Sequence, residues 1–334
     1  MIGTEFFYGQ GFGNQLFCYV TSRCIAIDNN CEYGTIGQSL FGAPRWNQNG
    51  AYFMDIDLGI RSEKTDFKYS YIEKSKRYFL KTGIHDRTIG CDISLYDKDL
   101  TTVSDGTLIA GNLQAEEYFL HHKEKIKQWL KVKQEYDSYE FCKDNLCVIN
   151  MRGGEYFGVK ELFLGKKYWH DAINNMKKIN SKMEFIIITD DIVTAQKVLP
   201  KIPAYHFDLA KDYVTIKNAK YLILSNSSFA FFPAFTSETV EYIIAPKYWA
   251  RHNVSDGYWA TGQNIYSGWH YQDRKGKIFN SDECRSEFEN YKIRCGLYSR
   301  ITKPIRRNII YKYSEKIIKF VGILKSTLKK KLKK

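Results

Sequence analysis

A glycine-rich turn near the start of the chain carries the first residues whose types and spacing could do chemistry. Residues 9–15 are Gly-Gln-Gly-Phe-Gly-Asn-Gln, and they join an aromatic run at 5–8 to a helical pattern over 14–27. A strand, a glycine-rich turn and a helix start in this order present backbone N–H groups at the positive end of a helix. Such a nest suits an anion, most often a phosphate.

The spacing of this turn excludes one familiar phosphate site. A dinucleotide-binding Gly-x-Gly-x-x-Gly pattern would need its third glycine where Asn14 or Leu16 stands. The amides of Asn14 and Gln15 instead add directional groups, which suit a ligand that carries both phosphate and hydroxyls. Gly13, Asn14 and Gln15 are therefore candidate ligand contacts, and the alternative is an ordinary strand-to-helix loop.

A second turn, after the apolar run at 146–150, contains the best anion clamp in the sequence. Arg152 leaves this run between Asn150 and a pair of glycines at 153 and 154. Its planar guanidinium can hold an oxyanion through two parallel hydrogen bonds. The alternative is a surface arginine in a turn, but an arginine between an apolar strand and two glycines favours a ligand site.

Polar side chains also follow the apolar runs at 184–189 and 221–224: Asp190 and Asp191 after the first, and Asn226, Ser227 and Ser228 after the second. In doubly wound sheets ligands bind beyond the carboxyl ends of the strands. We expect one aspartate to cap the next helix and the other to contact a ligand, while the serines suit a phosphate. A metal would need more carboxylates than this region offers, so no metal is predicted.

The spacing of the apolar runs predicts an α/β fold. From about residue 145 onward, continuous apolar strands alternate with helices, which is typical of a parallel sheet covered on both faces. The first half predicts a strand at 31–36, irregular loops over 41–75, a strand at 107–110 and an amphipathic helix over 115–132. Two such halves, joined near 133–145, predict two Rossmann-like units around a cleft.

The charge of the chain is concentrated at its C-terminal end. The sequence has a net charge of +13, but residues 303–334 hold 12 Lys or Arg and one acid, which leaves about +2 for the rest. Nucleic-acid binding is therefore not expected. Apolar residues recur with helical spacing along 301–334, which predicts a basic amphipathic helix that adsorbs to an anionic membrane surface. The alternative is a helix packed on the protein with its charged face in water.

The cysteines and the hydrophobic segments indicate in which cellular compartment the protein is expected. Eight cysteines show no Cys-x-x-Cys pair and no metal-ligand spacing with histidine. No secretory leader is recognisable, and the longest uncharged run, 221–237, contains polar residues and a proline that do not suit a membrane span. We therefore expect a cytoplasmic protein that lies peripherally on the inner face of the membrane.

Six short segments, taken in order, resemble one known family. They lie at residues 11–17, 111–119, 148–156, 188–191, 226–229 and 245–249. Among them are Gly-Phe-Gly-Asn-Gln-Leu-Phe, Asn-Ser-Ser-Phe and Ala-Pro-Lys-Tyr-Trp. The set is similar to the bacterial alpha-1,2-fucosyltransferases of glycosyltransferase family eleven, and its consistent order over most of residues 3–250 makes it specific although each segment alone is weak.

The resemblance implies a GT-B fold of two facing Rossmann-like domains. It also implies a metal-independent, inverting transfer of fucose from GDP-fucose to a hydroxyl of a surface glycan, such as an O-antigen or capsule precursor. The nucleotide sugar and a glycan acceptor, a lipid-linked one included, are then the partners, and no further cofactor is expected. The expected domains are an acceptor-side domain at 1–140, a nucleotide-sugar-binding domain at 141–300 and the membrane-associating tail at 301–334.

The same resemblance gives roles to the matched positions. Arg152 would neutralise the leaving diphosphate and Asn14 would reach the donor across the cleft, while Asp190 or Asp191 would hold the nucleoside. The whole expected donor site consists of Gly13, Asn14, Gln15, Asn150, Arg152, Asp190, Asp191, Asn226, Ser227 and Ser228. Glu155 and Glu161 are the carboxylates nearest to Arg152 in the sequence, so each is a candidate base for the acceptor hydroxyl or a simple partner of that arginine.

The arginine turn departs from the family pattern. Asn150 and Gly153 replace a His and a second Arg, and Glu155 replaces an Asp. One cation is therefore missing at the diphosphate, which is worth about 3 kcal/mol if nothing replaces it. The candidates to replace it are Lys160, Lys166 and Lys167. Two alternatives follow from the departure: a transferase of the same fold that uses another nucleotide sugar, or an inactive homologue that binds a glycan or a nucleotide.

Overall fold

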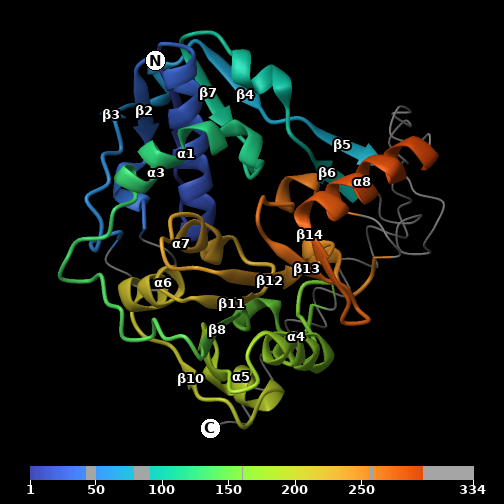
Figure 1. The fold of residues 1–334 in the computed structure, drawn as a ribbon. Helices are drawn as coiled ribbons and strands as arrows, with labels where there is room; N and C mark the ends of the chain where they lie inside the picture. Colours follow the sequence, from blue (N-terminus) through green and yellow to red (C-terminus); the bar gives the residue numbers. More distant parts are fainter. Residues whose placement is uncertain (43–49, 79–90, 160, 256–258, 260, 296–334) are drawn as a thin grey trace, which may run out of the picture.

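The computed structural model describes residues 1–42, 50–78, 91–159, 161–255, 259 and 261–295. It contains two parallel sheets, which lie in the upper and lower parts of Figure 1 and come from the N-terminal and C-terminal halves of the chain. The predicted α/β class with two Rossmann-like units is confirmed. The tail expected at 301–334 lies outside the described residues. None of the helices in the described ranges combines the length and hydropathy needed to cross a lipid bilayer.

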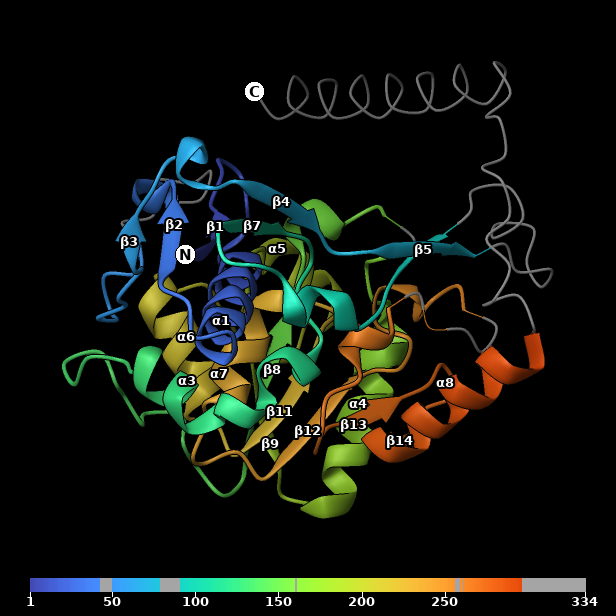
Figure 2. The same cartoon turned by 90° about the horizontal axis from the view of Figure 1, so that it is seen from above.

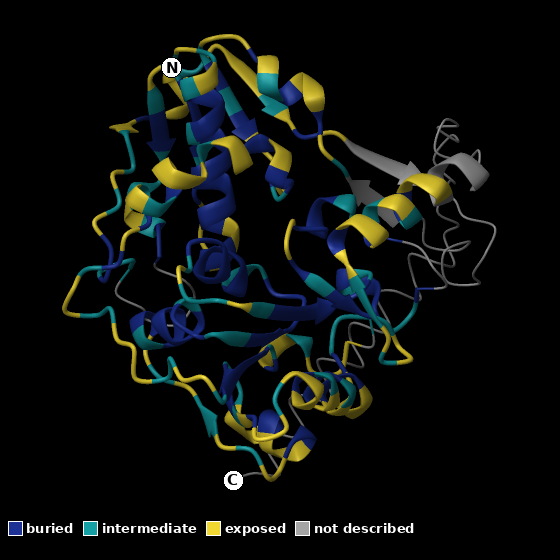
Figure 3. Ribbon diagram, viewed as in Figure 1, coloured by how far each residue is buried: buried dark blue, intermediate teal, exposed yellow. Residues whose placement is uncertain are grey.

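The first sheet has five parallel strands in the order β3-β2-β1-β7-β4. Their bounds are β1 (Ile2–Glu5), β2 (Tyr33–Ile36), β3 (Ile60–Arg61), β4 (Tyr69–Ile72) and β7 (Thr107–Ala110). Helix α1 (Phe12–Asp28) follows β1 through the glycine-rich turn and is buried along most of its length (Figure 3). Strands β5 (Ser75–Tyr78) and β6 (Cys91–Ser94) form a separate antiparallel pair.

The second sheet has seven strands in the order β10-β9-β8-β11-β12-β13-β14, and only β14 is antiparallel to its neighbour. Their bounds are β8 (Leu146–Met151), β9 (Glu184–Thr189), β10 (Ala204–Tyr205), β11 (Tyr221–Leu224), β12 (Tyr242–Pro246), β13 (His270–Gln272) and β14 (Ile278–Asn280). Up to β13 this is the strand order of a Rossmann sheet, in which the direction of winding reverses between β8 and β11. The carboxyl ends of these two strands therefore border the crevice where such folds bind ligands.

Helices cover both faces of the second sheet. Alternate residues of β8 point to opposite faces, so Cys147 packs with α4 (Lys166–Ile179) and α5 (Ile192–Val198), while Val148 packs with α6 (Leu209–Lys217). This explains why the strand is apolar at every position. The last helix among the described residues, α8 (Ser281–Cys295), extends with β5 and β6 to the side of the molecule opposite β2 and β3 (Figures 1 and 2).

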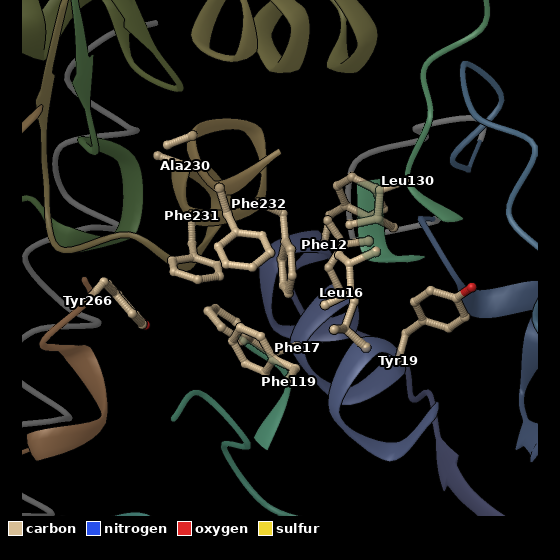
Figure 4. Close-up of a cluster of buried hydrophobic side chains, with 14 of the residues drawn as sticks. Phe12, Leu16, Phe17, Tyr19, Phe119, Leu130, Ala230, Phe231, Phe232 and Tyr266 are labelled. Carbon is tan, nitrogen blue, oxygen red and sulfur yellow. The ribbon is translucent and has the colours of Figure 1, made fainter. Parts of the chain in front are cut away.

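An aromatic core joins the two halves (Figure 4). Phe17 of α1 stacks on Phe231 of α7 (Phe231–Phe235), with ring centroids 4.7 Å apart, and Phe119 lies 5.9 Å from the same ring. At the start of α1, a Cβ added to Gly13 would lie 2.4 Å from the carbonyl carbon of Ser228. The glycine-rich turn of the first half therefore touches the polar turn that follows β11 in the second half.

Several predicted elements are confirmed, and two predictions are wrong. The strands expected at 107–110, 146–150, 184–189 and 221–224 are present, and so is the helix expected directly after Asp191. The continuous helix expected over 115–132 is instead two 3₁₀ turns, η4 (Glu116–Tyr118) and η5 (Leu120–His122), followed by α3 (Lys123–Trp129). The region 41–75, expected to be irregular, contributes β3 and β4 at the two edges of the first sheet.

The helix breaks because two adjacent side chains are buried against different neighbours. Tyr118 points toward Glu73, to which its hydroxyl donates at 2.9 Å, whereas Phe119 packs on the rings of α1 and α7. These tertiary contacts override the helical periodicity of the sequence, and the backbone leaves helical geometry at Phe119, with φ of −141°.

Candidate functional site

The turns after β8 and β11 are held side by side. The amide of Ser225 donates to the carbonyl of Asn150 at 3.0 Å, and its hydroxyl donates to the Asn150 side chain at 3.4 Å. The Tyr156 hydroxyl donates to the Asn226 carbonyl at 3.4 Å. Asn150 and Ser225 are buried, so the side chain of Asn150 joins the two strands instead of facing the crevice.

Arg152 lies at this crevice between two carboxylates. Its Nη1 forms an ion pair with Asp190 Oδ2 at 3.0 Å, and its Nη2 donates to Glu155 Oε1 at 3.2 Å. Asp190 also accepts a hydrogen bond from the amide of Gly153 at 2.7 Å, which fixes its carboxylate. The side chain of Arg152 is 34% exposed and that of Glu155 is 63% exposed, so the guanidinium is oriented by Asp190 while a more exposed partner covers its other side.

The glycines after Arg152 allow the turn to close on the next strand. A Cβ at position 153 would lie 2.8 Å from the Cβ of Asp191, and one at position 154 would lie 2.5 Å from Oδ2 of Asp190. Gly154 also has a φ of +36°, which side chains rarely adopt. The second arginine that the family pattern places at 153 would therefore require the turn after β9 to move. The glycine that stands at 153 in place of the family's arginine is thus part of a turn that packs closely on Asp191.

The two aspartates after β9 have different functions. Asp191 caps α5 by accepting hydrogen bonds from the amide of Thr194 at 3.0 Å and from its hydroxyl at 2.6 Å. Partial burial would raise the pKa of Asp191, but the two hydrogen bonds from Thr194 outweigh it and lower the pKa below its usual value. The prediction that one aspartate caps the helix is confirmed, and Asp190 is the one that reaches Arg152.

The turn after β11 contains a buried acceptor with no partner among the described residues. The Nδ2 group of Asn226 donates to the carbonyl of Leu162 at 3.1 Å, but its Oδ1 is buried and unpaired. An unpaired buried acceptor costs about 1–3 kcal/mol, so a donor from a ligand or a water molecule is expected there. Ser227 caps the following 3₁₀ turn, its hydroxyl accepting from the amide of Phe229 at 3.4 Å, and Ser228 is half-buried beside Gly13.

The glycine-rich turn uses its two amide side chains differently. Gln15 is buried, and its amide donates to the Leu40 carbonyl at 2.9 Å and accepts from the Gly42 amide at 2.7 Å. Both polar atoms of this side chain therefore help to hold the loop at 40–42. Asn14 is exposed, and its Oδ1 accepts from Gln114 at 3.3 Å.

A chain of amides continues from Asn14 to the C-terminal half. Gln114 accepts a hydrogen bond from Asn264 at 2.9 Å, and Asn264 donates to the hydroxyl of Tyr266 at 2.9 Å. The sequence prediction assigned no role to Gln114 or Asn264. The signal for Gln114 was present, because it lies in the family-like segment 111–119, whereas no motif marked Asn264.

Glu73 fixes the turn that carries Gln114. Its carboxylate accepts hydrogen bonds from the amides of Asn112 and Leu113, each at 2.9 Å, and from Gln263 of the C-terminal half at 2.6 Å. Burial raises the pKa of Glu73, although these hydrogen bonds oppose the shift. Leu113 is held at a φ of +55°, so this turn is stabilised by the buried carboxylate that its amides contact.

The remaining predicted residues follow the arginine turn in the sequence. Glu161 is half-buried in the turn that precedes α4. Of the lysines proposed to replace the missing cation, Lys167 forms an ion pair with Asp171 on α4, Lys166 is exposed at the first position of that helix, and Lys160 lies outside the described residues.

Comparison with known proteins places the chain near enzymes that transfer sugars. No protein-family model matches the sequence. In sequence, the chain is similar to an alpha-1,2-colitosyltransferase of Escherichia coli, with 24% identity over 264 residues that cover 72% of this chain and 89% of that protein.

Similar solved structures include the NodZ alpha-1,6-fucosyltransferase co-crystallised with GDP, with a TM-score of 0.41, 12% identity and coverage of 73% of this chain and 94% of that one. A glycosyl transferase family 9 protein of Veillonella parvula has a TM-score of 0.39 and 11% identity, covering 88% of this chain and 95% of that one. The sequence comparison thus connects this chain, over most of its length, with a glycosyltransferase.

Proposed function

We propose that this protein is an inverting glycosyltransferase whose nucleotide-sugar donor binds at the carboxyl ends of β8 and β11. The observation that carries the proposal is the position of Arg152 at this crevice, with its guanidinium held by Asp190 at 3.0 Å. The unpaired Oδ1 of Asn226 in the neighbouring turn adds a group that needs a donor such as a ribose or sugar hydroxyl. The sequence similarity to a colitosyltransferase supports the same class of reaction.

In this proposal Arg152 receives the diphosphate that leaves the sugar. The acceptor hydroxyl attacks the anomeric carbon from the face opposite the diphosphate, the bond to the diphosphate oxygen breaks, and that oxygen keeps the electron pair. A guanidinium held in place by Asp190 stabilises the charge that develops on this oxygen. Because Asp190 and Asp191 are engaged with Arg152 and Thr194, we propose that they position the site and do not themselves grip the nucleoside.

Glu155 must leave Arg152 when the diphosphate arrives. Its single contact with the guanidinium is 3.2 Å long and largely exposed to solvent, and exposed ion pairs of this kind contribute little stability. The diphosphate can therefore displace it at small cost. To take the proton of the acceptor hydroxyl, the released carboxylate then has to turn toward the face of the sugar opposite the diphosphate.

The variant E155Q tests this role. We expect its kcat to fall by about 10²- to 10⁴-fold, the usual contribution of a general base, while its affinity for GDP stays equal or increases because a competing carboxylate is lost. Steady-state kinetics and calorimetry with GDP measure the two quantities. The variant E161Q is the matched control, and a loss of kcat in E161Q with none in E155Q would transfer the role of base to Glu161.

The donor sugar defines two versions of the proposal. The family resemblance favours fucose carried by GDP, whereas the similarity to a colitosyltransferase favours colitose as the transferred sugar. Donor hydrolysis and transfer assays with a panel of GDP- and UDP-linked sugars should give turnover with GDP-fucose or with GDP-linked colitose. Turnover with UDP sugars alone would exclude both versions, and binding without turnover would indicate an inactive homologue.

The acceptor is proposed to be a hydroxyl of a surface-glycan precursor, reached from the cytoplasmic face of the membrane. The support is the basic, amphipathic pattern of 301–334, whose structure lies outside the described residues. A lipid-linked acceptor would lie at the same membrane surface as the segment 301–334.

A further inference from the structure

Two histidines and an aspartate converge at the end of α1 that is remote from the crevice. His121 Nε2 lies 2.9 Å from Asp28 Oδ2, and His122 Nε2 lies 2.7 Å from Asp28 Oδ1. The two imidazole rings are 4.2 Å apart between centroids, and the three ligand atoms all lie within 4.8 Å of one another. We refer to these three side chains as the Asp28–His cluster.

The fold brings the cluster together from distant parts of the chain. Asp28 is the last residue of α1, and both histidines lie in η5, more than 90 positions later. From adjacent positions of η5, both side chains reach the same carboxylate. His122 is 12% exposed and His121 is 51% exposed, so one side of the cluster is covered by protein and the other is open to solvent.

The charge at this end of α1 favours a cation. A helix carries partial negative charge at its C-terminus, and the last turn of α1 contains no basic residue. Asp28 adds a full negative charge at the same place. Its described ion-pair partners are the two imidazoles, which provide a positive charge only when protonated.

We propose that the Asp28–His cluster is a binding site for a divalent transition-metal ion of the zinc class. In a tetrahedral zinc site with bonds of about 2.0–2.1 Å, neighbouring ligand atoms are about 3.3 Å apart. The nitrogen–oxygen distances of 2.9 and 2.7 Å, which involve different oxygens of Asp28, need to open by about 0.4–0.6 Å to admit an ion. The ligand atoms already lie within 4.8 Å of one another, so small rotations of these three side chains bring them around one ion. Two imidazoles and one carboxylate suit Zn²⁺, and are not the oxygen-rich set that Mg²⁺ and Ca²⁺ require.

The fourth ligand of this site is water, which the open side of His121 admits. The ion would fasten the end of α1 to η5, and so stabilise the segment that leads from Gln114 to the aromatic core. The site is independent of the proposed sugar transfer, because the 17 residues of α1 separate it by about 25 Å from the glycine-rich turn. Failure of either proposal therefore leaves the other untouched.

Calorimetric titration of Zn²⁺ into the metal-free full-length protein, prepared without a histidine tag, tests the proposal. We expect one equivalent to bind to the wild type, with D28N, H121Q and H122Q each weakening it by at least about 100-fold, since removing even an outer partner of a metal ligand costs 10- to 100-fold. Glutamine keeps an N–H donor that can reach Asp28, so these variants preserve a hydrogen-bonded cluster while removing a metal ligand. Mg²⁺ should produce no saturable binding at the same concentrations.

Two further controls separate this site from other zinc ligands on the protein. H170Q changes an exposed histidine on α4, and H206Q changes one that pairs with Asp212 alone, so both should bind Zn²⁺ like the wild type. Zn²⁺ should raise the melting temperature of the wild type and of these controls, and leave that of the three cluster variants unchanged. Absence of saturable Zn²⁺ binding to the wild type, or binding that survives all three substitutions in the cluster, would overturn the proposal.

Discussion

Replacing Arg152 by alanine should reduce kcat for sugar transfer by about 10²- to 10³-fold, the cost of removing one preorganised charge donor from a transition state. This turn contains no second arginine, because a glycine stands at position 153 and a side chain there would collide with Asp191. The affinity for GDP should fall in parallel, since the diphosphate is present in both the donor and the product. Transfer assays under saturating donor and calorimetry with GDP measure the two losses.

The fold of this variant should be unaffected. Arg152 is partly exposed, and ion pairs of that kind contribute about 0–1 kcal/mol, so the melting temperature of R152A should stay close to that of the wild type. R152K is the informative partner variant, because it keeps the charge and loses the planar fork, and it should recover only part of the activity. Transfer rates within a few-fold of the wild type in R152A would refute the clamp.

The variant G13A should destabilise the protein and impair transfer together. An added Cβ at position 13 would lie 2.4–2.5 Å from backbone atoms of Ser228 and Phe229, which cannot move as a flexible side chain can. Overpacking of this kind costs about 1–3 kcal/mol, and here it also pushes the two halves apart at the proposed donor site. Urea unfolding should show the loss of stability, and transfer assays at a temperature where the variant is folded should show a reduced kcat.

The same turn contains a matched control for this substitution. A Cβ added to Gly11 meets no atom within 4 Å, and its φ of −65° is compatible with alanine. G11A should therefore keep the stability and activity of the wild type, or gain slightly in stability because the unfolded chain loses freedom. If G13A behaves like G11A, then the close contact between the two turns does not exist in solution.

The sequence determined which turns belong to the candidate site. The runs at 146–150, 184–189 and 221–224 are apolar at nearly every position, which is the pattern of parallel strands buried on both faces. Parallel strands joined by helices have their carboxyl ends at one edge of the sheet, so the polar residues after each run had to lie near one another. The order of apolar runs and polar turns is therefore sufficient to assign Arg152, Asp190 and Asn226 to one crevice.

The tertiary structure decided how those residues are used, because their partners lie far away in the chain. Glu73 contacts Gln263, Asn264 contacts Gln114, and neither pair leaves a periodic signal in the sequence. The same holds for the Asp28–His cluster, and for Gln15, whose amide is engaged with the loop at Leu40 and Gly42. Local periodicity records which face of an element is buried, whereas contacts across a hundred residues depend on how whole elements pack, and only the folded chain specifies that packing.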